Sequence, residues 1–130
     1  MRLLLDTQAW LWWLMGSARL PAPARDAITD PVNEVLVSAV SIIEIAEKIR
    51  AGTLGGMQPL TGDFEGNLDR DRFGRLSITM AHATRAATLE DAPIDLFDRI
   101  LIAQALIEDA VLVSNDIRFD GFGVRRLWER

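Results

Sequence analysis

The 130-residue chain has no cysteine, only one histidine and only one lysine. Without cysteine, it cannot form disulfides, thiolate nucleophiles or Cys-based zinc and iron sites. No apolar run approaches the roughly 18 residues that a membrane span needs, and the three leucines before Asp6 are too few for a signal peptide. We therefore expect a cytoplasmic protein with no membrane partner. The single histidine, His82, lies among alanines and is expected to pack against a helix rather than to act as a base.

The net charge of -5 argues at first against a nucleic-acid partner, because such proteins usually carry a basic surface. Two bound divalent cations would reduce this charge to about -1. In addition, 13 of the 14 basic residues are arginine, which contacts phosphates in a bidentate manner. The composition therefore neither supports nor excludes a nucleic-acid substrate.

The hydrophobic content of 49% is sufficient for one domain over residues 1–130 with a substantial core. Apolar runs predict strands, and apolar positions at helical spacing predict helices between them. The strands are expected at 3–5, 35–37, 75–78, 111–113 and 124–127, the helices at 7–15, 22–29, 41–51, 63–73, 80–89 and 95–109, and a loop at 52–62. This alternation predicts an α/β domain with a central, mainly parallel β-sheet flanked by helices.

Four acidic residues recur at the transitions between these elements. Asp6 and Asp116 follow two strands, and Glu44 and Asp98 lie in the first turns of two predicted helices. Because the carboxyl ends of parallel strands share one edge of a sheet, we expect the four carboxylates to converge. Converged oxygen ligands without a His or Cys cluster indicate Mg²⁺ or Mn²⁺ rather than zinc.

Each acid also has a purely structural explanation. Ser41-x-x-Glu44 fits a capping box, Glu44 is spaced to pair with Lys48, and Asp98 lies three residues after a possible Asp95 cap. Asp6 is the stronger functional candidate, because a charge beside a buried strand is costly unless it is compensated.

Two hydroxyl residues, Thr7 and Ser114, are possible accessory residues next to two of the acids. Each is suited to hold a metal-bound water or a phosphate oxygen, and each is equally suited to a turn or a cap. The cluster Trp10-Leu-Trp-Trp13 could stack on bases. Its position beside the first strand favours the core or an interface instead. Arginines near residues 50 and 70–75 form either a solvated surface or an RNA path.

Four segments in order resemble the successive motifs of PIN-domain nucleases, and most closely the toxin ribonucleases of VapBC-type toxin-antitoxin modules. These segments are Leu4-Leu-Asp-Thr7, Ser38-Ala-Val-Ser-Ile-Ile-Glu-Ile45, Asp95-Leu-Phe-Asp-Arg-Ile-Leu-Ile-Ala-Gln-Ala105 and Leu112-Val-Ser-Asn-Asp-x-x-Phe119. Relatives often have proline where Leu96 stands, histidine where Pro93 stands and tryptophan where Ile43 stands. No acid is lost, but substrate contacts near residues 92–96 are expected to differ.

The resemblance implies a Mg²⁺- or Mn²⁺-dependent endoribonuclease, usually a homodimer, that is inhibited by a cognate antitoxin protein. It assigns metal binding and catalysis to Asp6, Glu44, Asp98 and Asp116. The expected reaction is attack of a metal-activated water on an RNA phosphodiester, which leaves 5'-phosphate and 3'-hydroxyl ends.

Two other hypotheses stay open. One is a phosphatase or receiver-like domain in which Asp6 is phosphorylated, although a haloacid-type phosphatase would have aspartate where Gln8 stands. The other is a non-catalytic interaction module whose acidic edge receives arginines from a partner.

Overall fold

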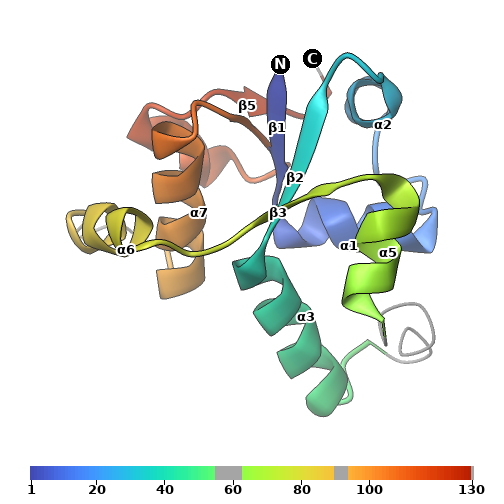
Figure 1. Cartoon of the computed structure of the whole chain (residues 1–130), viewed down its shortest axis with the longest axis horizontal. Coiled ribbons are helices and arrows are strands. Elements are labelled where there is room, and N and C mark those ends of the chain that lie inside the picture. The colour runs from blue at the N-terminus through green and yellow to red at the C-terminus, as the bar shows by residue number, and fades with distance from the viewer. Residues whose placement is uncertain (55–62, 90–93, 130) are drawn as a thin grey trace.

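Five parallel strands form the centre of the molecule. The computed structural model describes residues 1–54, 63–89 and 94–129. Within these ranges, all strands pair in parallel in the order β3-β2-β1-β4-β5 (Figure 1). The strands are β1 (Arg2–Leu5), β2 (Glu34–Ser38), β3 (Gly74–Leu76), β4 (Val111–Val113) and β5 (Arg126–Leu127). The predicted α/β class with a parallel sheet is confirmed.

The helices follow the predicted alternation. They are α1 (Thr7–Met15), α2 (Ala22–Thr29), α3 (Ala39–Arg50), α5 (Phe64–Asp71), α6 (Met80–Ala87) and α7 (Leu96–Ile107). A 3-10 helix, η2 (Ile117–Phe122), follows β4 and was not predicted. Of the predicted loop, residues 52–54 contain neither helix nor strand, and residues 55–62 lie outside the described residues.

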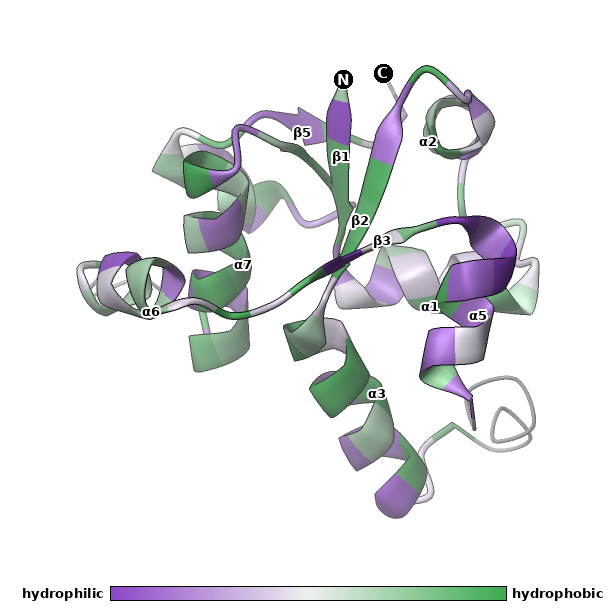
Figure 2. Cartoon of the chain, viewed as in Figure 1, coloured by the Kyte–Doolittle hydropathy of each residue, from purple (hydrophilic) through white to green (hydrophobic). Residues whose placement is uncertain are grey.

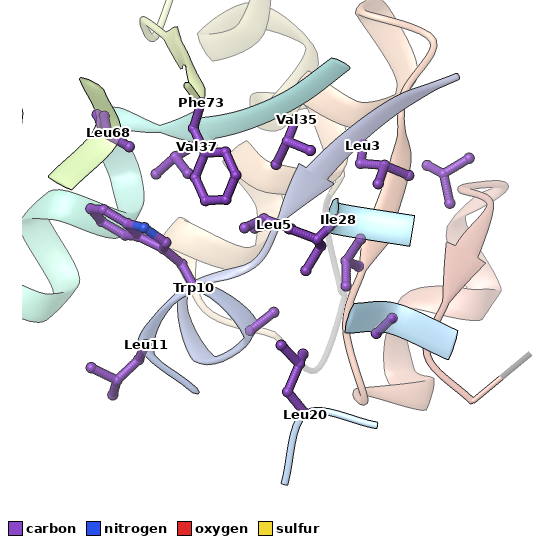
Figure 3. Close-up of a cluster of buried hydrophobic side chains, with 14 of the residues drawn as sticks. Leu3, Leu5, Trp10, Leu11, Leu20, Ile28, Val35, Val37, Leu68 and Phe73 are labelled. Atoms are coloured by element: carbon purple, nitrogen blue, oxygen red, sulfur yellow. The ribbon is translucent and has the colours of Figure 1, made fainter. Parts of the chain in front are cut away.

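The central strand β1 contributes to hydrophobic clusters on both faces of the sheet. Leu3 and Leu5 pack with Trp10 of α1 in one cluster, whereas Leu4 packs with Leu101 and Ile102 of α7 in the other. This division follows from the alternation of side chains along a strand. Figure 3 shows the first cluster, where Trp10 lies on the side of Val37 of β2 and Leu68. Helices α1, α2 and α5 lie on one side of the strands, and α6 and α7 lie on the other (Figure 1).

Hydropathy follows this layering. The inner part of β2 is hydrophobic, whereas α5, which borders the solvent, is largely hydrophilic (Figure 2). Leu68 is the buried residue of α5 and anchors this polar helix to the first cluster. In the parts of the chain that are described, no helix is long and apolar enough to cross a membrane.

The capping box that Ser41-x-x-Glu44 would fit, weighed above as a structural explanation of Glu44, is not formed. Helix α3 begins two residues earlier than predicted, and Ser38 is its N-cap, with Oγ accepting from the Val40 amide at 3.1 Å. The serine at the end of β2 has the extended backbone that an N-cap requires, so the helix starts directly from the strand. Glu44 consequently lies in the second turn of α3, not the first.

His82 is a structural residue, as predicted. It is fully buried, and its Nδ1 accepts from the Thr79 amide in the capping box that starts α6. Its Nε2 lies 3.0 Å from Glu108 Oε2 beyond the end of α7. The Nδ1 atom therefore caps α6, and the Nε2 atom joins α6 to the end of α7.

Candidate functional site

The four predicted acids line one pocket of about 320 Å³. Asp6 and Asp116 reach it from the ends of β1 and β4, and Glu44 and Asp98 reach it from α3 and α7. The predicted convergence of these side chains is therefore observed, even though they come from four separate parts of the chain. The pocket is also lined by Thr7, Gln8, Trp12, Lys48, Leu101, Asn115 and Phe119.

Asp6 is the most buried of the four acids, with 7% of its surface exposed. It is the N-cap of α1, where its Oδ1 accepts from the Ala9 amide at 2.7 Å. Burial raises the pKa of Asp6 to about 6, while hydrogen bonds from Ser114 and Ala9 oppose that rise. The cost expected for a charge beside the central strand is thus real and only partly compensated.

Thr7 and Ser114 are buried and contact the acids, and Ser114 also makes the turn contact that was its alternative explanation. Thr7 Oγ1 donates to Glu44 Oε1 at 2.5 Å, and therefore must accept its 3.0 Å hydrogen bond from Ser41. Ser114 Oγ accepts from the Asp116 amide at 3.0 Å while its hydroxyl bonds Asp6. Each hydroxyl fixes the position of at least one carboxylate.

Asp98 lies in the first turn of α7, where Asp95 is the N-cap and its Oδ1 accepts from the Asp98 amide at 2.8 Å. Burial raises the pKa of Asp98 to about 6, and the nearby charges of Asp95 and Glu44 add to this rise. Burial also raises the pKa of Glu44, against the effect of the Thr7 hydrogen bond. Both the predicted Asp95 cap and a close packing of negative charges are therefore present.

Arg118 supplies a positive charge at this edge of the sheet. Its Nη2 lies 2.6 Å from Asp116 Oδ2 and 3.7 Å from Asp98 Oδ2, and its Nε donates to both Asp116 oxygens at 3.0 Å. Chiefly through these hydrogen bonds, Arg118 lowers the pKa of Asp116. The lowered pKa of Asp116 thus contrasts with the raised pKa values of Asp6 and Asp98.

The donor set suits a hard divalent cation, since it consists of carboxylates backed by hydroxyl groups. The side chains are nonetheless spread around the pocket wall. Within residues 1–54, 63–89 and 94–129, no three acidic or histidine side chains are close enough together to hold one ion. An ion held by three of these side chains at once would therefore require them to move closer together.

Several residues of this edge were not identified from the sequence. Trp12 and Lys48 line the pocket, whereas the sequence had indicated Trp12 only as part of the Trp10–Trp13 cluster and Lys48 only as a possible partner of Glu44. Arg118 follows Asp116 by two residues, and this spacing is typical of a turn that brings both side chains together. The spacing is the sequence feature from which Arg118 could have been identified. The Trp cluster divides: Trp10 is fully buried in the core, Trp12 faces the pocket, and Trp13 donates to Asp71 at 3.0 Å.

Three of the arginines that were considered for an RNA path, Arg50, Arg70 and Arg75, are paired with neighbouring acids. Arg75 contacts Glu65 and Asp69, and Arg70 contacts Asp71. Arg50 pairs with Glu47 on α3. These exposed pairs support the interpretation of a solvated surface. Residues 92 and 93, part of the segment expected to contact substrate unusually, lie outside the described residues.

The raised pKa of Asp6 predicts that acidification stabilises the protein in chelator. A folded-state pKa of about 6 against 3.8 means that the folded protein binds more protons in this range, so stability falls as pH rises through 6. Between pH 7.5 and 5 the gain from Asp6 should be on the order of 1 kcal/mol. Denaturant melts at both pH values measure this gain in stability. The Asp6→Asn variant retains the N-cap acceptor but should lose the part of the gain that comes from Asp6.

Asp120→Asn provides the matched control. Its hydrogen bond to Arg126 lowers the pKa of Asp120, so this group titrates below the tested range. The Asp120 variant should therefore keep the wild-type difference between pH 5 and 7.5. An Asp6→Asn variant with that same difference would show that Asp6 is not the destabilised carboxylate.

Comparison with known proteins gives the family and the fold of this chain. The PIN domain family model matches residues 3–124. Among solved structures, VapBC2 from Rickettsia felis, bound to a promoter DNA fragment, superposes with a TM-score of 0.74 at 15% identity, covering 98% of this chain and 99% of that one. DNA-bound VapBC from Salmonella typhimurium gives 0.72 at 16% identity, covering 98% and 97%. FitAcB from Neisseria gonorrhoeae gives a TM-score of 0.66 at 18% identity, covering 96% of each chain.

A search of curated proteins found no match. The family match spans nearly the whole sequence, and the chain belongs to the PIN-domain family.

Proposed function

We propose that this PIN domain is a Mg²⁺- or Mn²⁺-dependent endoribonuclease and the toxin of a type II toxin-antitoxin pair. The observation that carries this proposal is the meeting of four carboxylates from β1, α3, α7 and the end of β4 in one pocket. A family whose members are nucleases and a pocket with this chemistry support the same conclusion. The family match also favours this hypothesis over the phosphatase or receiver-like one.

Asp6, Glu44, Asp98 and Asp116 would hold the cation, which when bound activates water and stabilises the departing oxygen of a phosphodiester. Thr7 holds Glu44, and Ser114 holds both Asp6 and the backbone of Asp116. Their role is to limit the rotation of the carboxylates. In the proposed hydrolysis the water oxygen joins phosphorus and the bond to the 3' oxygen breaks, which gives 5'-phosphate and 3'-hydroxyl ends.

The two cationic side chains at this edge are suited to the substrate phosphates. Lys48 lines the pocket one helical turn after Glu44. Arg118, on release from Asp98 and Asp116, can bond a phosphate oxygen with the same guanidinium. The net charge of the chain thus does not prevent a nucleic acid from reaching the acidic pocket, because positive groups border it.

The cleavage assay compares two acids of one segment. Asp116 and Asp120 each pair with an arginine, but only Asp116 lines the pocket. Asp116→Asn keeps the shape and removes a charge, so cleavage of RNA in Mn²⁺ should fall roughly 100-fold or more, the equivalent of about 3 kcal/mol of transition-state stabilisation. Binding of RNA should change little.

Asp120→Asn should cleave nearly as well as wild type, with matched circular dichroism spectra for both variants. The reverse ranking would show that the wrong acid of the pair has been assigned. Absence of cleavage by the wild type over a panel of structured RNAs in Mn²⁺ would favour the non-catalytic interaction module.

The proposed antitoxin is a protein that inserts an arginine or lysine into the acidic pocket. The Arg118 contacts to Asp98 and Asp116 support this, because they show that a guanidinium is accommodated between these carboxylates. The likeness of the fold to the solved VapBC structures supports a partner of this kind. Association of two copies into a homodimer is also a prediction, which light scattering on the purified chain would test.

Expression of the chain alone should slow the growth of a bacterial host, and coexpression with the protein encoded beside it should restore growth. The physical reason is that an inserted cationic side chain would occupy the pocket and exclude substrate. Growth curves and copurification measure both effects, with Asp116→Asn as the inactive control. Equal growth inhibition by wild type and Asp116→Asn would separate toxicity from the proposed cleavage.

A further inference from the structure

A second hollow adjoins the acidic pocket. It has a volume of about 450 Å³ and is lined by Asn115, Ile117, Arg126, Trp128 and Glu129, which we call the Trp128 subsite. Asn115 lines both hollows, so the two are direct neighbours. The subsite is built by Arg126 of β5 and by residues that follow β4 and β5, at the same carboxyl edge of the sheet as the four acids.

Aromatic rings connect the two hollows. Trp12 lines the acidic pocket, Trp128 lines the subsite, and their ring centroids are 5.7 Å apart at an interplanar angle of 47°. Both rings are only partly buried against the core. Arg19 lies over the Trp12 ring at 6.0 Å from its centroid. A ligand that spans the hollows would therefore pass from carboxylates to an aromatic surface.

The charges of the subsite do not favour a phosphate. The Arg126 guanidinium is held by Asp120 at 2.7 Å and by the Ser114 carbonyl at 3.0 Å, and Glu129 adds a negative charge. Arg126 is thus fixed and largely neutralised. The remaining features are a flat aromatic face, the exposed side chain of Ile117 and the Asn115 amide, which can both donate and accept. A planar, apolar ligand with polar edges matches this set.

We propose that the Trp128 subsite binds one unpaired nucleobase of the substrate strand, next to the phosphate in the acidic pocket. The base stacks on Trp128, and the Asn115 amide hydrogen-bonds its edge. This inference rests on the proposed nuclease function, because that function places the strand in the adjoining pocket. Bases inside a duplex are stacked on one another, so the subsite selects single-stranded segments.

The test measures binding in chelator, where cleavage is absent. The probe is a single-stranded RNA octamer with 2-aminopurine at successive positions, because the fluorescence of this base is quenched when it stacks on an aromatic ring. One position should be quenched by the wild type. Trp128→Leu should weaken binding about 5- to 150-fold, the effect of losing one base-aromatic stack. Trp128→Phe should retain part of the binding.

Trp13→Leu is the matched control. Trp13 is also partly buried, but it packs against Phe73 and bonds Asp71, and it lines neither hollow. This variant should lose stability without losing affinity for the octamer. If Trp128→Leu fails to fold, the quenched position in the wild type and the Trp128→Phe affinity still decide the question.

The outcomes separate this inference from the proposed function. Wild-type affinity and wild-type cleavage in a folded Trp128→Leu variant would overturn the subsite and leave the nuclease intact. Quenching and Trp128-dependent binding without any cleavage in Mn²⁺ would support the subsite while contradicting the nuclease. Equal affinity for a duplex of the same sequence, or no quenched position, would also overturn the subsite.

Discussion

The burial of a charged carboxylate at the end of the central strand is the constraint on which the site depends. Asp6 is held there because β1 runs between β2 and β4 and because α1 must start immediately after it, with Asp6 as its cap. The Asp6 amide donates to the Val113 carbonyl at 3.0 Å, which ties this position to the end of β4. The other acids are then gathered around a group that water can barely reach, and their mutual repulsion adds to its cost.

Arg118 relieves part of this repulsion within the chain itself. It bridges Asp98 and Asp116, two acids that the sequence places on different elements, and so occupies the position that an external cation or a partner's arginine would compete for. Arg118 therefore stabilises the folded chain at the same carboxylates to which the proposed function assigns the cation. A group that displaced Arg118 would have to replace its contacts with Asp98 and Asp116, and under the proposed function Arg118 would then be available to substrate phosphates.

The features that could be predicted from the sequence are those that depend on local residue patterns and on the order of the strands. The bounds of α1 and α2 followed from apolar spacing and from Asp30-Pro31, and the convergence of the acids followed from the rule that parallel strands share a carboxyl edge. The Ser38 cap was missed because Ser41-x-x-Glu44 offered a better local motif, and only the strand-to-helix geometry decides between them. Arg118 contacts Asp98, and Trp12 contacts Trp128. Both contacts join side chains from separate elements, and the periodicity of the sequence does not encode such contacts.

The central claim is that the four carboxylates form a cation site, and diffraction from crystals soaked in Mn²⁺ tests it most directly. The account predicts an anomalous peak between Asp6, Glu44, Asp98 and Asp116, with the Arg118 guanidinium displaced from Asp98 and Asp116. The peak should be lost in Asp116→Asn crystals and kept in Asp120→Asn crystals. Arg118 still bridging Asp98 and Asp116 at saturating Mn²⁺, with no peak in the pocket, would contradict the account.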